Sequence, residues 1–219
     1  MVWDWNGTLL DDAWLCVEVM RGLLAKYELP GIDLARYGDV FGFPVKDYYV
    51  DLGFDFSRTP FETVGTEFID GYAARENRCC LREGARRVIE HLEAADVTQS
   101  VLSASEKPRL LGQARRLGIE SFFEDIVALD DHYAGGKTVV GRQWLKASGH
   151  APGSVLLVGD TDHDVDVAAE LGIHCVLVPS GHQSKWRLST LGVHIIDSLE
   201  VLPDVLGPPM KESKLVRKG

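Results

Sequence analysis

The sequence predicts an α/β protein with a doubly wound, Rossmann-like parallel sheet as its core and a small all-helical cap domain inserted after the first strand. Three observations support this prediction. Short apolar runs alternate with helical patterns after about residue 80, the stretch from 13 to 80 contains only helical patterns, and polar residues directly follow several apolar runs. Alternation of strands with helices is typical of parallel sheets, because the chain must cross back before each new strand.

The apolar runs are short and rich in β-branched residues, as interior strands of parallel sheets are. The predicted strands are 1–3, 97–102, 126–129, 155–158, 175–178 and 193–196. The helical patterns of the core cover 83–95, 108–117, 138–148, 164–171 and 198–206. Six strands separated by helices predict a sheet that is covered on both faces.

The stretch after the first strand breaks this alternation. Its helical patterns cover 13–27, 44–52 and 60–75, and Pro and Gly separate them. We expect Asp11 or Asp12 to cap the first of these helices. The predicted domains are therefore a core of residues 1–12 and 81–219 and a cap of residues 13–80. Residues 208–219 contain few apolar side chains and are expected to form a frayed tail.

The chain is acidic and of ordinary globular composition. Its 23 Lys and Arg stand against 33 Asp and Glu, which gives a formal net charge of −10. This charge disfavours nucleic acid and anionic lipid as partners. The sequence contains neither an apolar run near the roughly 18 residues of a membrane helix nor a secretory signal pattern, and its four cysteines lack zinc or CxxC spacing. We expect a cytoplasmic protein with reduced thiols.

Polar residues follow predicted strands at several points. In an open parallel sheet, ligands bind beyond the carboxyl ends of the strands, so these positions are the first candidates for a site. They are the Asp-Trp-Asn-Gly-Thr run 4–8, Ser103, Lys137 at a helix start, and the Gly-Asp-Thr-Asp-His-Asp run 159–164. An acidic protein that binds phosphate at such a site must concentrate positive charge there, in a metal ion or a few lysines.

These four positions resemble the haloacid dehalogenase superfamily. Its members carry a DxDGT motif, a Ser or Thr after the second core strand, a Lys and a GDxxxD motif, in the order found here. The helical insert between the first two motifs is similar to that of the subgroup with a small helical cap, which includes phosphoglycolate phosphatases. The resemblance covers the whole core and implies a hydrolase of a small phosphomonoester, with Mg²⁺ as cofactor.

The resemblance also implies a role for each acidic motif residue. Asp4 is expected to attack phosphorus and form an aspartyl phosphate, which splits a difficult displacement into two easier ones. Asp4 and Asp160 are expected to hold Mg²⁺, together with the backbone carbonyl of Asn6 and with Asp164 through water. Oxygen ligands and retained water are what this ion prefers.

The remaining matched residues are expected to bind phosphate or select the substrate. Thr8 and Ser103 can donate hydrogen bonds to phosphate oxygens, and Lys137 brings a positive charge to the transferring group. In the cap, Phe43 and Lys46 lie in a turn where relatives of the family set substrate choice. We predict that these two residues contribute to specificity.

Position 6 departs from the phosphatase pattern. The superfamily's phosphatases usually carry a second Asp there, which protonates the leaving alkoxide and then activates water. Asn6 cannot exchange a proton near neutral pH, and general acid–base help is typically worth about 10²–10⁴-fold in rate. Three loop histidines are candidates to replace the missing acid: His132, His163 and His182.

Alternatives remain open from the sequence. A dehalogenase-type enzyme works without metal and does not need the pair Asp160 and Asp164. A phosphonatase-type enzyme would need a Schiff-base lysine in the cap, for which Lys26 and Lys46 are available. A third alternative is a non-catalytic protein that binds phosphate or a partner. The expected partner is a small phosphorylated metabolite, neither nucleic acid nor membrane, and the substrate and the oligomeric state are not encoded legibly.

Overall fold

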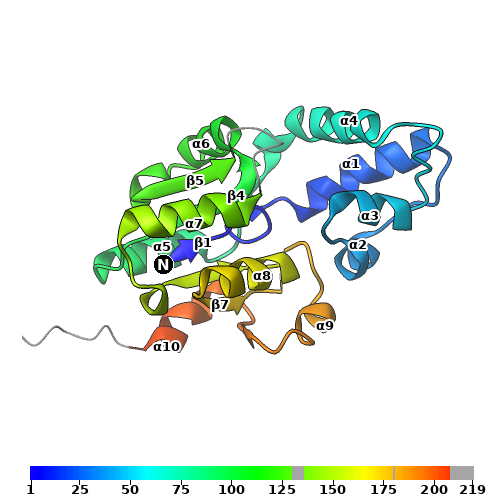
Figure 1. Cartoon of the computed structure of the whole chain (residues 1–219). Coiled ribbons are helices and arrows are strands. Elements are labelled where there is room, and N and C mark those ends of the chain that lie inside the picture. Colours follow the sequence, from blue (N-terminus) through cyan, green and yellow to red (C-terminus); the bar gives the residue numbers. More distant parts are fainter. Residues whose placement is uncertain (130–135, 180, 208–219) are drawn as a thin grey trace, which may run out of the picture.

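The computed structural model describes residues 1–129, 136–179 and 181–207 of the chain. Its central sheet has six parallel strands in the spatial order β5-β4-β1-β6-β7-β8 (Figure 1). The strands are β1 (Val2–Trp3), β4 (Ser100–Glu106), β5 (Asp125–Leu129), β6 (Leu156–Gly159), β7 (His174–Leu177) and β8 (His194–Ile195). The order reverses at β1, which pairs with β4 on one side and β6 on the other. A sheet of this kind binds ligands at such a switch point.

Helices cover both faces of the sheet, so the predicted doubly wound core is confirmed. The helices of the core are α5 (Ala85–Ala94), α6 (Lys107–Arg116), α7 (Lys137–Ser148), α8 (Asp162–Leu171), α9 (Lys185–Leu188) and α10 (Leu202–Leu206). Val2 packs in one apolar cluster with Trp144 of α7 and Val167 of α8. The next residue, Trp3, packs in the other cluster with residues of α5 and α6. Side chains of a strand alternate between faces, so the first strand contributes to both clusters.

The cap contains four helices that lie beside the carboxyl ends of the strands (Figure 1). They are α1 (Ala13–Lys26), α2 (Leu34–Val40), α3 (Val45–Asp51) and α4 (Phe61–Ala73). Helix α2 is missing from the predicted patterns because it has only seven residues; the Asp33 carboxylate caps it by accepting a hydrogen bond from the Arg36 amide at 2.7 Å. Asp12 occupies the N-cap position of α1, but its carboxylate makes no capping hydrogen bond. The prediction of an acidic side-chain cap at Asp12 is therefore wrong.

A two-stranded antiparallel sheet joins the cap to the core. It pairs β2 (Leu10–Asp11) with β3 (Cys80–Leu81), and strands of two residues are too short to show a period in the sequence. Four 3₁₀ turns complete the described elements: η1 (Glu76–Arg78), η2 (Glu120–Phe122), η3 (Pro152–Ser154) and η4 (Leu199–Val201). Both connections between cap and core therefore run side by side.

Some predictions fall on residues that the structure does not describe. They are the tail 208–219 and the candidate acid His132. In the described ranges, no helix has both the length and the apolar character needed to cross a bilayer.

Candidate active site

Lys137 joins two carboxylates at the carboxyl edge of the sheet. Asp4 follows β1 directly, and Lys137 is the first residue of α7. The Lys137 Nζ donates to Asp4 Oδ1 at 2.6 Å and to Asp164 Oδ1 at 2.5 Å. Burial by itself would lower the pKa of Lys137, but the two carboxylates hold this pKa above its ordinary value. The lysine is therefore a fixed cation beside Asp4.

Asp160 is held against the loop that follows β1. Its Oδ1 accepts a hydrogen bond from the Thr8 hydroxyl at 3.0 Å, and its Oδ2 accepts one from the His182 backbone N–H at 2.5 Å. Gly7 passes over this carboxylate with a φ of +76°, and a Cβ there would collide with Asp160 Oδ2. Only glycine combines that backbone conformation with so close an approach.

Asp164 both starts α8 and positions Lys137. Its Oδ2 accepts hydrogen bonds from the backbone N–H groups of Asp160 and Thr161, at 3.1 Å and 3.0 Å, and from the Thr161 hydroxyl at 2.7 Å. The reciprocal bonds of Thr161 and Asp164 form a capping box. The Asp164 Oδ1 atom is left to face Lys137. Asp160 and Asp164 of the GDxxxD motif are four positions apart, which is about one helix turn, and this spacing lets Asp164 accept from the Asp160 backbone.

The donor set at this edge fits a divalent cation. Asp4, Asp160 and Asp164 offer carboxylate oxygens within 4.8 Å of one another. Lys137 is the single ammonium that bonds to them in the described part of the chain. Burial raises the pKa of Asp4 to about 8 and that of Asp160 to about 6. Three carboxylates beside a single ammonium leave negative charge to be balanced, and Mg²⁺ prefers such oxygen ligands.

Asn6 is fixed by hydrogen bonds at both ends of its amide. Its Nδ2 donates to Asp12 Oδ2 at 2.7 Å and to the Tyr72 hydroxyl at 3.2 Å. Its Oδ1 accepts from the Ser105 hydroxyl at 2.5 Å. The amide orientation follows from these partners, because a carboxylate can only accept. An aspartate at position 6 would bring a second carboxylate against Asp12.

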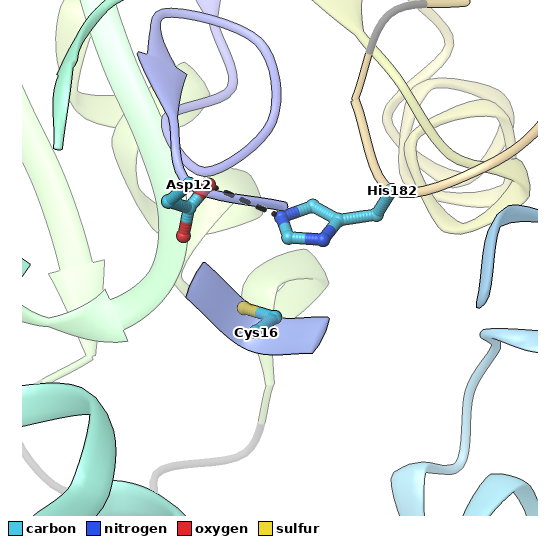
Figure 2. Close-up of side chains that lie close together, drawn as sticks. All are labelled: Asp12, Cys16 and His182. Carbon is cyan, nitrogen blue, oxygen red and sulfur yellow. Dashed lines mark ion pairs between the residues drawn. The ribbon is translucent and has the colours of Figure 1, made fainter. Parts of the chain in front are cut away.

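Asp12 and His182 form a buried ion pair (Figure 2), with 3.4 Å between Oδ1 and Nε2. Asp12 also accepts from the Gly7 backbone N–H at 2.9 Å and from the Tyr72 hydroxyl at 2.7 Å. The second ring nitrogen of His182 lies 2.7 Å from the Tyr37 hydroxyl. Burial by itself would lower the pKa of His182, but Asp12 raises it to about 9. Burial opposes the ionised form of Asp12 too, yet His182 keeps the pKa of this carboxyl below its usual range.

Cys16 lies next to this pair on α1 (Figure 2), and the three side chains offer possible metal ligands within 4.8 Å of one another. Burial raises the pKa of the Cys16 thiol well above its usual value, so the thiol stays protonated. The carboxylate and the imidazolium already balance each other in charge. A protonated thiol beside a balanced ion pair is a structural arrangement, and the oxygen-only group around Asp4 is the better cation site.

A cavity of about 600 Å³ separates the cap from the core. The core side of its lining is polar and includes Asp4, Ser103, Lys137, Asp160 and Asp164. The cap side is largely aromatic and includes Phe41, Phe43, Tyr48, Tyr49, Phe61 and Phe68. This volume lies within the range of pockets for small molecules, roughly 300–1,000 Å³. The nucleophile candidate therefore stands at the polar end of a cavity between cap and core.

Comparison with known proteins identifies the family. The family model of the haloacid dehalogenase-like hydrolases matches residues 1–178. The chain belongs to this family. Its fold is shared with a haloacid dehalogenase-like protein of Streptococcus pneumoniae, with a TM-score of 0.81, 18% identity and coverage of 94% of this chain and 97% of the other. A predicted phosphoglycolate phosphatase of Haemophilus somnus gives a TM-score of 0.74 and 16% identity, with 94% and 96% coverage.

Curated relatives of this hydrolase-family chain carry the name tyrosine-protein kinase PtkA. The proteins of Mycobacterium bovis and Mycobacterium tuberculosis are 30% identical to it over 186 residues. The match covers 83% of this chain and 62% of each relative, so the chain spans less than two thirds of their length. The solved structure of the M. tuberculosis protein has a TM-score of 0.78 and 27% identity, and the alignment covers 94% of this chain and 96% of that one.

Two predicted phosphate ligands of the family motif have different surroundings. Ser103 lines the cavity, and its hydroxyl accepts a hydrogen bond from the Ser105 backbone N–H at 3.1 Å. Thr8 is fully buried, and its hydroxyl donates to Asp160. The described lining of the cavity does not include Thr8. Ser103 is therefore placed to meet a ligand directly, whereas Thr8 orients an acidic residue.

The two predicted specificity residues of the cap also differ. Phe43 lines the cavity, with its ring centroid 4.7 Å from that of His163. Lys46 is exposed, and its Nζ lies 5.8 Å from the centroid of the Phe56 ring. Among the described residues that line the cavity, Lys46 does not occur. Phe43 therefore borders the cavity, whereas Lys46 does not.

Sequence reasoning missed several residues of the site. Asp12 was expected only at a helix start, and no pattern pointed to Tyr72 or Ser105. Tyr72 lies 60 positions from Asp12, and Ser105 lies 99 positions from Asn6. His182 was named as a loop histidine, but nothing in the sequence indicated its acidic partner. Contacts between residues so far apart in the sequence leave no local sequence pattern that could predict them.

Proposed function

We propose that the protein is a Mg²⁺-dependent phosphohydrolase that transfers the phosphoryl group of a small phosphomonoester to Asp4 and then to water. The observation that carries this proposal is the Lys137 ammonium bonded to both Asp4 and Asp164 at the polar end of the cavity. The proposed substrate is a phosphorylated metabolite and the proposed compartment the cytoplasm.

In the first step, a carboxylate oxygen of Asp4 attacks phosphorus, and the bond from phosphorus to the leaving oxygen breaks. The leaving oxygen keeps the electron pair and takes a proton from solvent. Lys137 offsets the charge of the Asp4 carboxylate and of the transferring group, and Ser103 can donate to a phosphate oxygen. Asp164 positions Lys137 through its 2.5 Å hydrogen bond.

In the second step, a water oxygen attacks phosphorus, and the bond between phosphorus and Asp4 breaks. Inorganic phosphate forms, the Asp4 carboxylate is regenerated, and the proton of the attacking water passes to solvent. Asn6 cannot take the proton of the attacking water. His182 has both ring nitrogens committed to Asp12 and Tyr37, so it does not replace the missing base in this arrangement.

Asp4 and Asp160 are the residues that would hold Mg²⁺, with the Asn6 carbonyl and, through water, Asp164, as the family resemblance implies. When bound, the ion supplies positive charge to the phosphate oxygens and lowers the cost of ionising the buried acids. The raised pKa values of Asp4 and Asp160 support this proposal, because they reflect carboxylates that lack enough compensating charge.

A second candidate function is phosphoryl transfer to an acceptor hydroxyl instead of water. Two observations favour it: both ends of the Asn6 amide are occupied, and the relatives at 30% identity are named tyrosine-protein kinases. Because neither Asn6 nor His182 can serve as the base for water, the aspartyl phosphate should persist long enough for another hydroxyl to attack it. The acceptor oxygen would form the new bond to phosphorus, and its proton would pass to solvent.

Phosphate release from a panel of phosphomonoesters, with Mg²⁺ or with EDTA, tests the first candidate. We expect activity that EDTA abolishes and added Mg²⁺ restores, and activity unaffected by EDTA would contradict the metal role. The lifetime of a hydroxylamine-sensitive phosphoenzyme distinguishes the second candidate, since rapid decay in water supports hydrolysis and slow decay with capture by a tyrosine peptide supports transfer. Absence of both phosphate release and phosphoenzyme would support a non-catalytic protein.

A further inference from the structure

We infer that the cap end of the cavity binds an aryl group, so that the substrate is an aryl phosphate and not an alkyl phosphate. This inference rests on the proposed phosphoryl transfer at Asp4. It concerns the part of the substrate that leaves, which faces the cap while the phosphate faces Lys137. Three features of the described residues support it.

The first feature is an aromatic lining supplied by separate segments of the cap. Phe41 follows α2, Tyr48 and Tyr49 lie on α3, and Phe61 begins α4. Phe41 packs edge to face on Tyr48, with 5.3 Å between ring centroids, and Tyr49 packs likewise on Phe61 at 5.6 Å. These contacts hold the rings in fixed orientations. Aromatic rings favour further aromatic partners in edge-to-face or offset geometry, beyond the effect of buried area alone.

Phe43 extends this lining toward the core. Its side chain is 45% exposed, although it sits against the His163 ring and 5.5 Å from the Phe41 ring. A large apolar ring of this exposure at the edge of a cavity is available to a ligand. It lies between the aromatic cap side and the acidic loop that contains Asp160, where the two halves of an aryl phosphate would join.

The second feature is the hydroxyl of Tyr48. It is the one buried side-chain polar atom without a hydrogen-bond partner in the part of the chain that the structure describes. Tyr48 is only 4% exposed and lines the cavity. An unpaired buried hydroxyl costs about 1–3 kcal/mol. Because burial raises the pKa of Tyr48, this solvent-inaccessible hydroxyl stays protonated. A rotation of the Tyr48 side chain toward the cavity that it lines would let the hydroxyl donate to a polar substituent of a bound ring.

The third feature is chemical and independent of the cap. Asn6 cannot protonate the leaving oxygen, and its amide is already bonded to Asp12 and Ser105. A phenol has a pKa of about 10, whereas that of water is about 15.7 and alkyl alcohols are similar to water. A phenolate therefore leaves with much less help from an acid. The aromatic cavity and the missing acid both indicate the same class of substrate.

Calorimetric titration with stable phosphonates tests this inference without turnover. Phenylphosphonate and cyclohexylphosphonate have rings of similar size, but only the first is aromatic. With Mg²⁺ present, we expect phenylphosphonate to bind about 10-fold more tightly, which corresponds to about 1.4 kcal/mol. Equal affinities would overturn the inference and leave the proposed phosphoryl transfer standing. Failure of both phosphonates and of inorganic phosphate to bind would contradict the proposed function, and the inference with it.

A matched pair of tyrosine variants tests the Tyr48 hydroxyl. Hydroxyl- and amino-substituted phenylphosphonates should include at least one that binds the wild type several-fold more tightly than the parent compound. Tyr48→Phe should remove that preference while keeping affinity for phenylphosphonate. Tyr27→Phe is the control, because the Tyr27 hydroxyl contacts Glu67 at 3.3 Å outside the cavity lining. A preference that survives in Tyr48→Phe would overturn the role of this hydroxyl.

Competition experiments distinguish two sources of the aryl phosphate. In them, phosphotyrosine and a phosphotyrosine peptide each compete with bound phenylphosphonate. Displacement of phenylphosphonate by both supports a protein side chain as the source. Displacement by phosphotyrosine alone supports a small molecule. Displacement by neither, at concentrations where phenyl phosphate competes, would limit the inference to simple aryl phosphates, and failure of phenyl phosphate itself would overturn it.

Discussion

Two buried charge clusters adjoin each other at the cavity, where the His182 backbone N–H donates to Asp160, and they differ in their charge balance. The Lys137 cluster contains Asp4, Asp160 and Asp164, and its ammonium bonds to Asp4 and Asp164 only, so the acids outnumber the cation. The Asp12 cluster pairs one carboxylate with one imidazolium, and hydrogen bonds occupy both carboxylate oxygens. Surplus charge in a buried group indicates a ligand of opposite charge. Balanced charge indicates a fixed framework.

The two clusters also differ in the elements they connect. The Lys137 cluster is built from the core alone, at the ends of β1 and β6 and the starts of α7 and α8. The Asp12 cluster crosses the boundary, because Tyr37 and Tyr72 belong to cap helices and His182 belongs to the core. The first cluster is therefore assigned to chemistry, and the second to the joint between cap and core.

The largest expected effect concerns the Lys137 cluster. Asp4→Asn should reduce phosphate release by at least about 10⁴-fold, because it removes the proposed nucleophile. The free energy of unfolding should change less than in Asp12→Asn, since Lys137 keeps Asp164 as a counter-charge. Steady-state kinetics and urea denaturation measure the two quantities. Activity within 10-fold of the wild type would remove the distinction between the clusters.

The next effect concerns the framework role of the Asp12 cluster. Asp12→Asn should lower the free energy of unfolding by about 3–5 kcal/mol, because it leaves His182 buried without its counter-charge. Asp11→Asn is the matched control: its carboxylate is half exposed, pairs with Arg82 at 3.3 Å, and should change stability by less than about 1 kcal/mol. Equal effects of the two variants would contradict the framework role.

The pH dependence of stability sharpens the comparison further. The folded-state pKa of His182 is raised from 6.5 to about 9. Its ion pair therefore stabilises the fold fully below pH 6.5, and this contribution is lost as pH rises through 9. The whole contribution is about 3 kcal/mol. The difference in unfolding free energy between wild type and His182→Gln should shrink by that amount between pH 6 and pH 10.

A control histidine isolates this effect from the other titrating groups. His91 is exposed on α5, so His91→Gln should differ little from wild type in its free energy of unfolding. Chemical denaturation at several pH values measures both variants. A pH-independent difference for His182→Gln would show that its contacts contribute through packing alone.

The smallest expected effect concerns Asn6, which lies between the clusters. Asn6→Asp should not raise the rate on alkyl phosphates, because the new carboxylate would stand 2.7 Å from Asp12 Oδ2. The double variant Asn6→Asp with Asp12→Asn exchanges the amide and the acid, and should raise that rate about 10²-fold. An equal gain in the single variant would show that Asp12 does not determine the residue at position 6.

Most of the fold was predictable because its cause is periodic in the sequence. All six predicted strands and the five predicted core helices overlap observed elements. The residues of the Lys137 cluster were also predictable as a group, since parallel strands bring their carboxyl ends to one edge. Their roles in catalysis remain predictions. Short elements show no reliable period, so their prediction was uneven: α2 and β2 were missed, whereas α3 and β8, which have the same lengths, overlap predicted elements.

Apolar periodicity and strand order were enough to predict the sheet, the helical insert after the first strand and the set of acids beside Lys137. The ion pair of Asp12 with His182, the two-ended bonding of Asn6 and the unpaired Tyr48 hydroxyl became visible in the folded chain alone. Those features depend on where the cap helices rest against the core. Contacts across 60 to 170 positions depend on side-chain direction and loop path, which no local pattern records.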